Sequence, residues 1–163
     1  MGQINTRDVV LLGATAVTTS GTGNDIVVPQ GWQAAIVSVQ IGTVTGTSPT
    51  FDVYVQKKIN QPASTDLSGN LPTGTAIYDD LIHFTQMSTT ATRICQIATG
   101  AMSPSANSSL ITTADWANAN QSIAAGDARV GPIGGTWRVA YVLGGTSPAG
   151  TVSVCVQLIP WST

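Results

Sequence analysis

The chain has very little charge, and glutamate is missing from it altogether. All eight acidic residues are aspartate, and the only lysines are Lys57 and Lys58. Charged residues make up only 9% of the 163 positions, against 42% hydrophobic. Exposed helix faces are usually built from glutamate, lysine and leucine, whereas valine, threonine, isoleucine and glycine dominate here. The composition therefore predicts an all-β protein.

The scarcity of charge also bears on partners. A free monomer normally keeps an ample charged surface for solubility, so a chain this neutral favours an assembly that covers much of its surface. A net charge of −2 and a pI near 4.9 argue against non-specific nucleic-acid binding, which needs a basic face. No apolar run approaches the length of a membrane span, and residues 1–8 are polar. We expect a homo-oligomer, with no nucleic acid, no membrane and no signal peptide.

Residues that carry chemistry are equally scarce. His83 is the only histidine, and its strand-like surroundings predict a half-exposed sheet position. No Gly-x-Ser-x-Gly elbow is present, and Asp79-Asp80 is interpreted as a turn or strand entry. Cys95 and Cys155 lack the spacing of a zinc site and are expected to be free thiols. The sequence therefore predicts no enzyme, no metal and no cofactor.

The chain does contain a four-residue motif that occurs twice, each time between two predicted strands. Gly-Thr-Ser-Pro occurs at residues 46–49 and again at 145–148. The flanking runs alternate apolar and polar residues, the period of a strand with one buried face. Because glycine and proline favour turns, we predict two hairpins, one from residues 37–41 and 51–55 and one from 137–143 and 152–158. Their apolar side chains should face one core: Val37, Val39, Ile41, Phe51, Val53, Val55, Trp137, Val139, Tyr141, Val152, Val154 and Val156.

The remaining segments complete the predicted fold. A continuous apolar run at residues 8–17 predicts a strand buried on both faces, and residues 25–28 a short strand. Residues 82–86 and 92–97 predict a further hairpin. Long connections are expected at 60–76 and 99–135. We therefore predict a single antiparallel β-sandwich over residues 8–163, jelly-roll-like and of about eight strands, preceded by an arm at residues 1–7.

The same motifs carry a resemblance. Gly-Thr-Ser-Pro followed by Asp-Val-x-Val-Gln at residues 52–56, then Phe84-Thr85-Gln86, then Arg138-x-x-Tyr141 leading into the second Gly-Thr-Ser-Pro, resembles small β-sandwich virion proteins of tailed bacteriophages. Some of these are capsid decoration (cement) proteins. The resemblance implies a structural protein that binds the major capsid protein on the capsid surface after synthesis in the bacterial cytoplasm. Symmetric clusters are the default for such parts, and a homotrimer is the first expectation.

Binding residues are expected where the strand pattern stops. Trp116, Asp115 and Asn118 lie in an irregular segment, and Trp161 lies near the end of the sequence. An aromatic body with a polar tip suits an interface, although both tryptophans could instead cap the ends of the sandwich. Two alternative functions stay open: a tail or neck component, and a carbohydrate-binding host-adhesion domain with Trp116, Asn118 and Asn120 as its platform.

Overall fold

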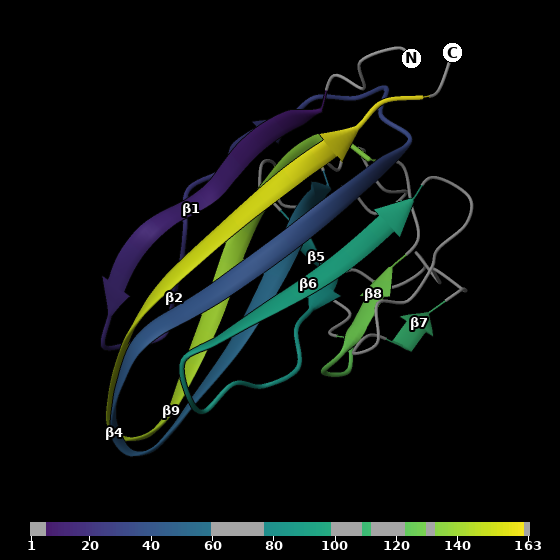
Figure 1. The fold of residues 1–163 in the computed structure, drawn as a ribbon. Helices are drawn as coiled ribbons and strands as arrows, with labels where there is room; N and C mark the ends of the chain where they lie inside the picture. The colour runs from purple at the N-terminus through teal and green to yellow at the C-terminus, as the bar shows by residue number, and fades with distance from the viewer. Residues whose placement is uncertain (1–5, 60–76, 99–108, 112–122, 130–132, 162–163) are drawn as a thin grey trace, which may run out of the picture.

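The fold consists of strands alone (Figure 1). The computed structural model describes residues 6–59, 77–98, 109–111, 123–129 and 133–161. The strands are β1 (Arg7–Val17), β2 (Gly21–Thr22), β3 (Ile26–Val28), β4 (Ala34–Ile59), β5 (Ile77–His83), β6 (Ala91–Ala98), β7 (Ser109–Ile111), β8 (Asp127–Arg129) and β9 (Gly135–Ile159). No helix occurs within these ranges, and hence none that could cross a membrane. The all-β prediction is confirmed.

The fold is organised by two long strands, β4 and β9, which pair antiparallel along most of their length. Their register runs from Ala34 opposite Ile159 to Lys57 opposite Trp137. Midway, the two Gly-Thr-Ser-Pro segments face each other, with Thr47 opposite Thr146. The prediction of two separate hairpins is therefore wrong, because neither repeat reverses the chain between neighbouring strands. Instead, both repeats lie at the bend of a single two-stranded ribbon.

The bend explains why glycine and proline recur there. Gly46 and Gly145 have φ angles of 112° and 97°, and Ser48 and Ser147 have 48° and 50°. Positive φ angles are tolerated by glycine and only sparsely by other residues. The register between the strands also shifts at several points between Gly42 and Thr50. Such irregularities turn a strand sharply, as β-bulges do. The ribbon can therefore fold back over itself.

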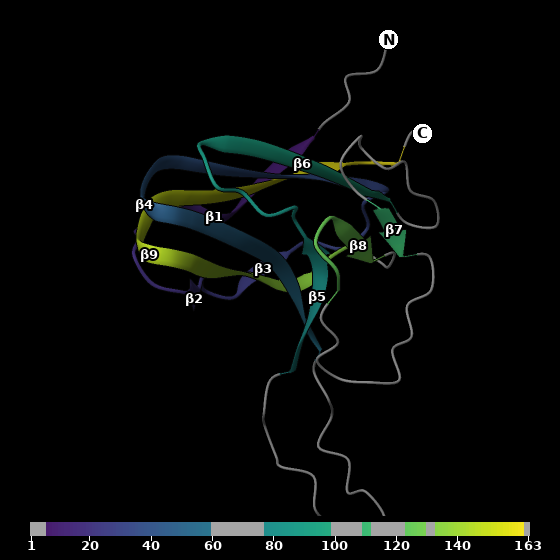
Figure 2. The same cartoon turned by 90° about the horizontal axis from the view of Figure 1, so that it is seen from below.

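Folding of the ribbon places the strands in two layers that are continuous at the bend (Figure 2). The first layer contains residues 34–42 of β4 and 150–159 of β9, with β6 and β1 at its edges. The second layer contains residues 50–59 of β4 and 135–144 of β9, flanked by β5 on one side and by β2 and β3 on the other. Beyond β5 lie β8 and then β7, and β7 with β8 forms the one parallel pair in the described sheet.

This arrangement corrects a further pairing. Residues 82–86 and 92–97 do not form a hairpin, because β5 pairs with the second half of β4 and β6 with its first half. The two segments therefore lie in different layers, and the chain between them crosses from one layer to the other. The hydrogen-bonded sheet is antiparallel apart from β7 and β8, and it is not closed.

The hydrophobic core fills the space between the layers. The alternating apolar sets on both halves of β4 and β9 belong to one buried cluster, as predicted, and Trp137 is fully buried within it. Tyr141 packs against this cluster and is only partly buried. The prediction for β1 is wrong, because β1 is an edge strand and is not buried on both faces: Leu11 and Val17 are buried, whereas Val10 is 55% exposed.

Candidate interaction surfaces

The outer face of the second layer carries a network of polar side chains that bind one another, and it also exposes Val27 and Val142. At one end, Lys58 Nζ lies 2.9 Å from Asp25 Oδ2, and the Tyr78 hydroxyl donates to both oxygens of Asp25 at 2.7 and 2.9 Å. These hydrogen bonds, from Lys58 first and Tyr78 second, lower the pKa of Asp25 below its ordinary value. The same contact raises the pKa of Lys58. This end of the face therefore stays an ion pair over the physiological range of pH.

The network continues across three strands. Arg138 Nε donates to Gln56 Oε1 at 2.8 Å, and Gln56 Nε2 donates to Asp80 Oδ1 at 2.8 Å. The guanidinium of Arg138 also lies 3.3 Å from the centre of the Tyr78 ring, close enough for a cation–π contact. Asp80 was predicted to occupy a turn or strand entry; it lies inside β5 and is buried. Its backbone carbonyl accepts a 2.9 Å hydrogen bond from Arg129 Nε.

His83 lies at the other end of this face and is only 8% exposed, so the prediction of a half-exposed position is wrong. Its Nδ1 lies 2.8 Å from the carbonyl oxygen of Ile123, and because a carbonyl only accepts, Nδ1 carries the proton. The ring stacks on Tyr54 at 4.0 Å. Burial raises the pKa of Tyr54, and the carboxylates of Asp52 and Asp80 raise it further.

The second ring nitrogen of His83 decides whether the residue could act in catalysis. Nε2 lies 3.5 Å from Asp52 Oδ1 and has no hydrogen-bond partner among the described residues. A nucleophile activated by histidine would have to be hydrogen-bonded to such a nitrogen. Asp52 is instead held by Gln86, whose Nε2 donates to Oδ2 at 2.8 Å. Within the described part of the chain, no three His, Cys, Asp or Glu residues are grouped so as to hold a metal ion.

The outer face of the first layer, by contrast, has almost no charged side chains. Its outward positions carry hydroxyl, amide and apolar side chains, and Asp8, at one end of β1, is the only charged residue among them. We call this the neutral face and define it by Asp8, Val10, Ile36, Ser38, Gln40, Gly42, Thr92, Ile94, Gln96, Thr151, Ser153, Cys155 and Gln157. Most of these side chains are exposed or half-buried.

A band of four residues with an exposed aliphatic side chain at each end crosses the middle of the neutral face. The register places Val10 beside Cys155, Cys155 beside Ser38, and Ser38 beside Ile94, one residue from each of four strands. Val10 and Ile94 are 55% and 51% exposed, and Cys155 is exposed. A large aliphatic side chain left this open to water on a sheet face is typical of a contact surface when it lies within a continuous patch.

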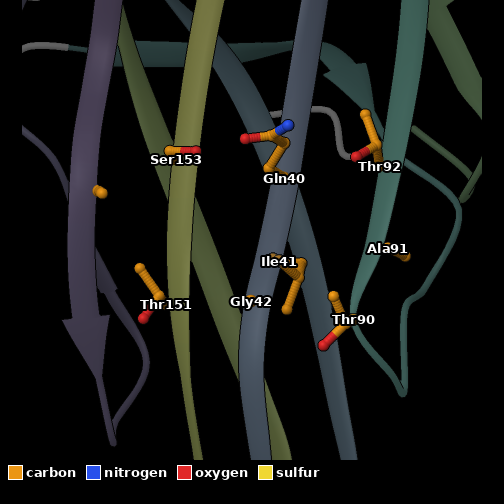
Figure 3. Close-up of a pocket in the computed structure, with 9 residues that line it drawn as sticks. Gln40, Ile41, Gly42, Thr90, Ala91, Thr92, Thr151 and Ser153 are labelled. Carbon is orange, nitrogen blue, oxygen red and sulfur yellow. The ribbon is translucent and has the colours of Figure 1, made fainter.

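A shallow groove lies next to this band, towards the bend (Figure 3). Its volume is about 490 Å³, and Gly42 leaves its floor open because no other atom lies within 4 Å of the place where a Cβ would sit. Figure 3 shows Gln40, Ser153, Thr92 and Thr151 on neighbouring strands around the groove. Their hydroxyl and amide groups can both donate and accept hydrogen bonds. The neutral face can therefore satisfy polar groups of a partner without burying a charge.

A second groove, which we call the tryptophan groove, lies at the end of the molecule away from the bend. Its volume is about 360 Å³, and it is lined by Gln30, Gly31, Trp32, Lys57, Ile133, Gly134 and Trp161. Trp161, a predicted interface residue, is 55% exposed. The structure brings it together with Trp32 and Lys57, which sequence reasoning did not connect to it. Burial lowers the pKa of Lys57.

The other predicted interface residues, Trp116, Asp115 and Asn118, and also Asn120, lie outside the described residues. Searches of the chain against protein-family models, curated proteins and solved structures found no match.

Proposed function

We propose that this chain is a structural virion protein, a capsid decoration protein that binds the assembled shell of the major capsid protein through its neutral face. The observation that carries the proposal is the contrast between the two outer faces. Charged side chains on the second layer already bind other side chains of the same chain, as Lys58 binds Asp25 and Arg138 binds Gln56. The neutral face exposes Val10 and Ile94 among uncharged polar groups, whereas Val27 and Val142, also exposed, share the outer face of the second layer with charged side chains.

The physical reason for choosing the neutral face is the cost of removing water. A buried charge is expensive unless it is paired with good geometry, whereas hydroxyls and amides need only one or two hydrogen bonds each. Flat sheet faces that offer such groups around a small apolar centre can be covered at low cost. Attachment at many equivalent shell positions then multiplies a modest affinity per subunit.

The strand arrangement supports the virion class. The strand segments of the first layer follow the order β1, second half of β9, first half of β4, β6. Those of the second layer follow the order β3, first half of β9, second half of β4, β5. From these two orders we infer a jelly-roll-like sandwich of about eight strands, an architecture common among capsid proteins. Symmetric placement on a shell favours a trimer as the functional unit.

The test is co-sedimentation with heads assembled in the absence of this protein. The variant is Ile94→Lys on the neutral face, and the matched control is Val142→Lys on the outer side of the second layer, where Val142 is 48% exposed. Each change places one ammonium group on an exposed strand position, so the folding cost should be similar. We expect wild type and V142K to bind heads and raise their rupture temperature, and I94K to bind at least about tenfold more weakly.

Equal binding by I94K and V142K would contradict the neutral face as the contact surface. Failure of the wild-type protein to bind heads would overturn decoration. A copy number per virion that follows the rotational symmetry of the tail, and not the number of shell subunits, would assign the protein to the tail or neck.

A further inference from the structure

His83 and Asp52 form a pair whose facing atoms both accept hydrogen bonds. Nδ1 of His83 carries the proton that the carbonyl of Ile123 accepts, so Nε2 of the neutral ring offers only a lone pair. Nε2 is buried and has no hydrogen-bond partner among the described residues, and Asp52 Oδ1 lies 3.5 Å from it. An ionised carboxylate also only accepts. Two lone pairs therefore face each other across a short gap, and a bound cation is one explanation of such an unsatisfied buried atom.

The separation of these two atoms is that of two ligands on one metal ion. Zinc binds imidazole nitrogen at about 2.0–2.1 Å and carboxylate oxygen at about 2.0–2.2 Å, so tetrahedral geometry places two such ligands about 3.3–3.5 Å apart. The distance of 3.5 Å between His83 Nε2 and Asp52 Oδ1 lies at the upper end of that range. An N–H···O hydrogen bond is shorter, at about 2.7–3.2 Å. The distance therefore suits a shared metal ion better than a hydrogen bond.

Both side chains are held by contacts that leave their facing atoms free. The Nδ1–H of His83 donates to the Ile123 carbonyl at 2.8 Å, and the ring stacks on Tyr54 with 4.0 Å between the ring centroids. Gln86 Nε2 donates to Oδ2 of Asp52 at 2.8 Å, which leaves Oδ1 beside His83. A metal-binding histidine almost always donates its other N–H to a carbonyl, a carboxylate or water, and ligating carboxylates are in turn hydrogen-bonded. The orienting contacts of a metal site are therefore present.

The donor atoms select the class of ion. One imidazole nitrogen with one carboxylate oxygen suits Zn²⁺, Co²⁺ or Ni²⁺, whereas Mg²⁺ and Ca²⁺ take oxygen ligands. No third His, Cys, Asp or Glu joins the pair within the part of the chain that the structure describes, so water completes the coordination. The Asp52 side chain is 20% exposed and that of His83 10%, so the ion enters from the side of Asp52. The carboxylates of Asp52 and Asp80 both raise the pKa of Tyr54, a sign of negative potential that favours a cation here.

We propose that His83 Nε2 and Asp52 Oδ1 bind one divalent transition-metal ion, with Zn²⁺ as the probe. The ion links β4, which contains Asp52, to β5, which ends at His83. Because the ligands come from different strands, the site exists only in the folded chain, and zinc therefore stabilises the fold. The expectation of no metal rested on the spacing of the cysteines, which gives no sign of a pair assembled from two strands. The site lies on the second layer, away from the neutral face, and does not rest on the decoration proposal.

The experiment titrates the full chain with Zn²⁺ at about pH 7.5, where an ordinary histidine is neutral. The readout is the pair of ring nitrogen signals of His83 in long-range ¹H–¹⁵N spectra. His83 is the only histidine of the sequence, so these signals need no assignment. We expect the Nε2 signal to move while Nδ1 keeps its proton, with a Kd below about 1 mM. Mg²⁺ at the same concentration should leave both signals where they are.

Three variants make the test specific. Asp52→Asn keeps the shape of the side chain and removes its charge, and it should weaken zinc binding at least about tenfold, since the loss of an outer-shell partner alone costs about 10–100-fold. Asp8→Asn removes the same charge from the neutral face and should bind zinc as wild type does. His83→Asn retains an N–H donor close to the position of Nδ1 but has no Nε2. Zinc should raise the urea midpoint of wild type and leave that of H83N unchanged.

Three results would overturn the proposal. The first is an Nε2 signal that does not move with up to about 10 mM Zn²⁺, or that moves equally with Mg²⁺. The second is an equal loss of zinc affinity in D52N and D8N, and the third is equal stabilisation of H83N and wild type by zinc. The first needs no variant, so it decides the matter even if D52N does not fold. None of these results bears on attachment to heads, which is measured separately.

Discussion

Replacing the glycines at the bend by alanine tests the central feature of the fold. A Cβ on Gly46 would lie 2.7 Å from the carbonyl oxygen of Ser147, and one on Gly145 would clash with the carbonyl oxygen of Ser48 on the facing strand. Alanine at such φ angles costs about 1–3 kcal/mol, and overpacking adds about 1–3 kcal/mol. The lower entropy of the unfolded alanine chain offsets about 0.4–1 kcal/mol. Together these contributions span about 1–6 kcal/mol, and we expect G46A and G145A each to fall near the middle of that range, with a loss of about 2–4 kcal/mol of unfolding free energy.

A matched control lies in the same strand. Gly42 has no positive φ, and no other atom lies within 4 Å of its Cβ position, so Gly42→Ala should be neutral or stabilise by up to about 1 kcal/mol. Urea denaturation followed by tryptophan fluorescence measures all three variants, with changes in midpoint at a constant m-value reporting stability. Losses of about 2–4 kcal/mol are large against the roughly 5–15 kcal/mol typical of a domain.

The same bend can be tested by cross-linking. Thr47 and Thr146 are register partners, and Cα atoms paired in an antiparallel ladder lie about 4.5–5.5 Å apart, within the range for a disulfide. Thr47→Cys with Thr146→Cys, in a Cys155→Ser background, should therefore oxidise with the loss of two hydrogens in the intact mass. If G46A and G145A were as stable as G42A and the cysteine pair failed to oxidise, the continuous ribbon would be refuted and the two-hairpin arrangement restored.

Two further predictions concern the core and the thiols. Val154→Asp should abolish cooperative unfolding, because Val154 is fully buried and the carboxylate of the introduced aspartate would be unpaired. Ser153→Asp, one residue away on the outer side, should still fold. A V154D variant that melts cooperatively would contradict the assignment of faces. Cys155 should react with a thiol reagent in the native protein and Cys95 only after unfolding, both without prior reduction, because Cys155 is exposed and Cys95 buried; two native reactive thiols, or none, would be the opposing result.

The alternation of apolar and polar residues along the strands made the core predictable, because membership of the core depends only on which side of its strand a residue faces. Val37, Val53, Val139 and Val154 could therefore be assigned to the buried side from the sequence, and the structure has them there. Pairing could not be assigned in the same way, since the hydrogen bonds of a ladder are made by the backbone and carry little side-chain signature. Gly-Thr-Ser-Pro fits both a hairpin turn and a bend within a ribbon.

The candidate surfaces were less predictable than the core, for related reasons. His83 had the local pattern of a half-exposed strand residue and Asp80 that of a turn or strand entry. Both are buried because Ile123, Tyr54 and Gln56 cover or bind them from other segments. Trp161 could be singled out as an aromatic near the end of the sequence. Its position beside Trp32, 129 residues earlier in the sequence (161 − 32), could not be predicted, because it depends on the pairing of β4 with β9.

The corrected pairing also explains how a neutral face arises in this chain. The first half of β4 has no charged residue, whereas its second half contains Asp52, Lys57 and Lys58. In β9 the order is reversed, with Arg138 in the first half and no charge in residues 150–159. Because the strands are antiparallel and both bend, the two uncharged halves meet in one layer and the two charged halves in the other. Two separate hairpins would instead have paired an uncharged segment with a charged one in each. The segregation of charge therefore depends on the ribbon, so a variant that disrupts the bend should lose attachment to heads together with stability, whereas I94K should lose attachment alone.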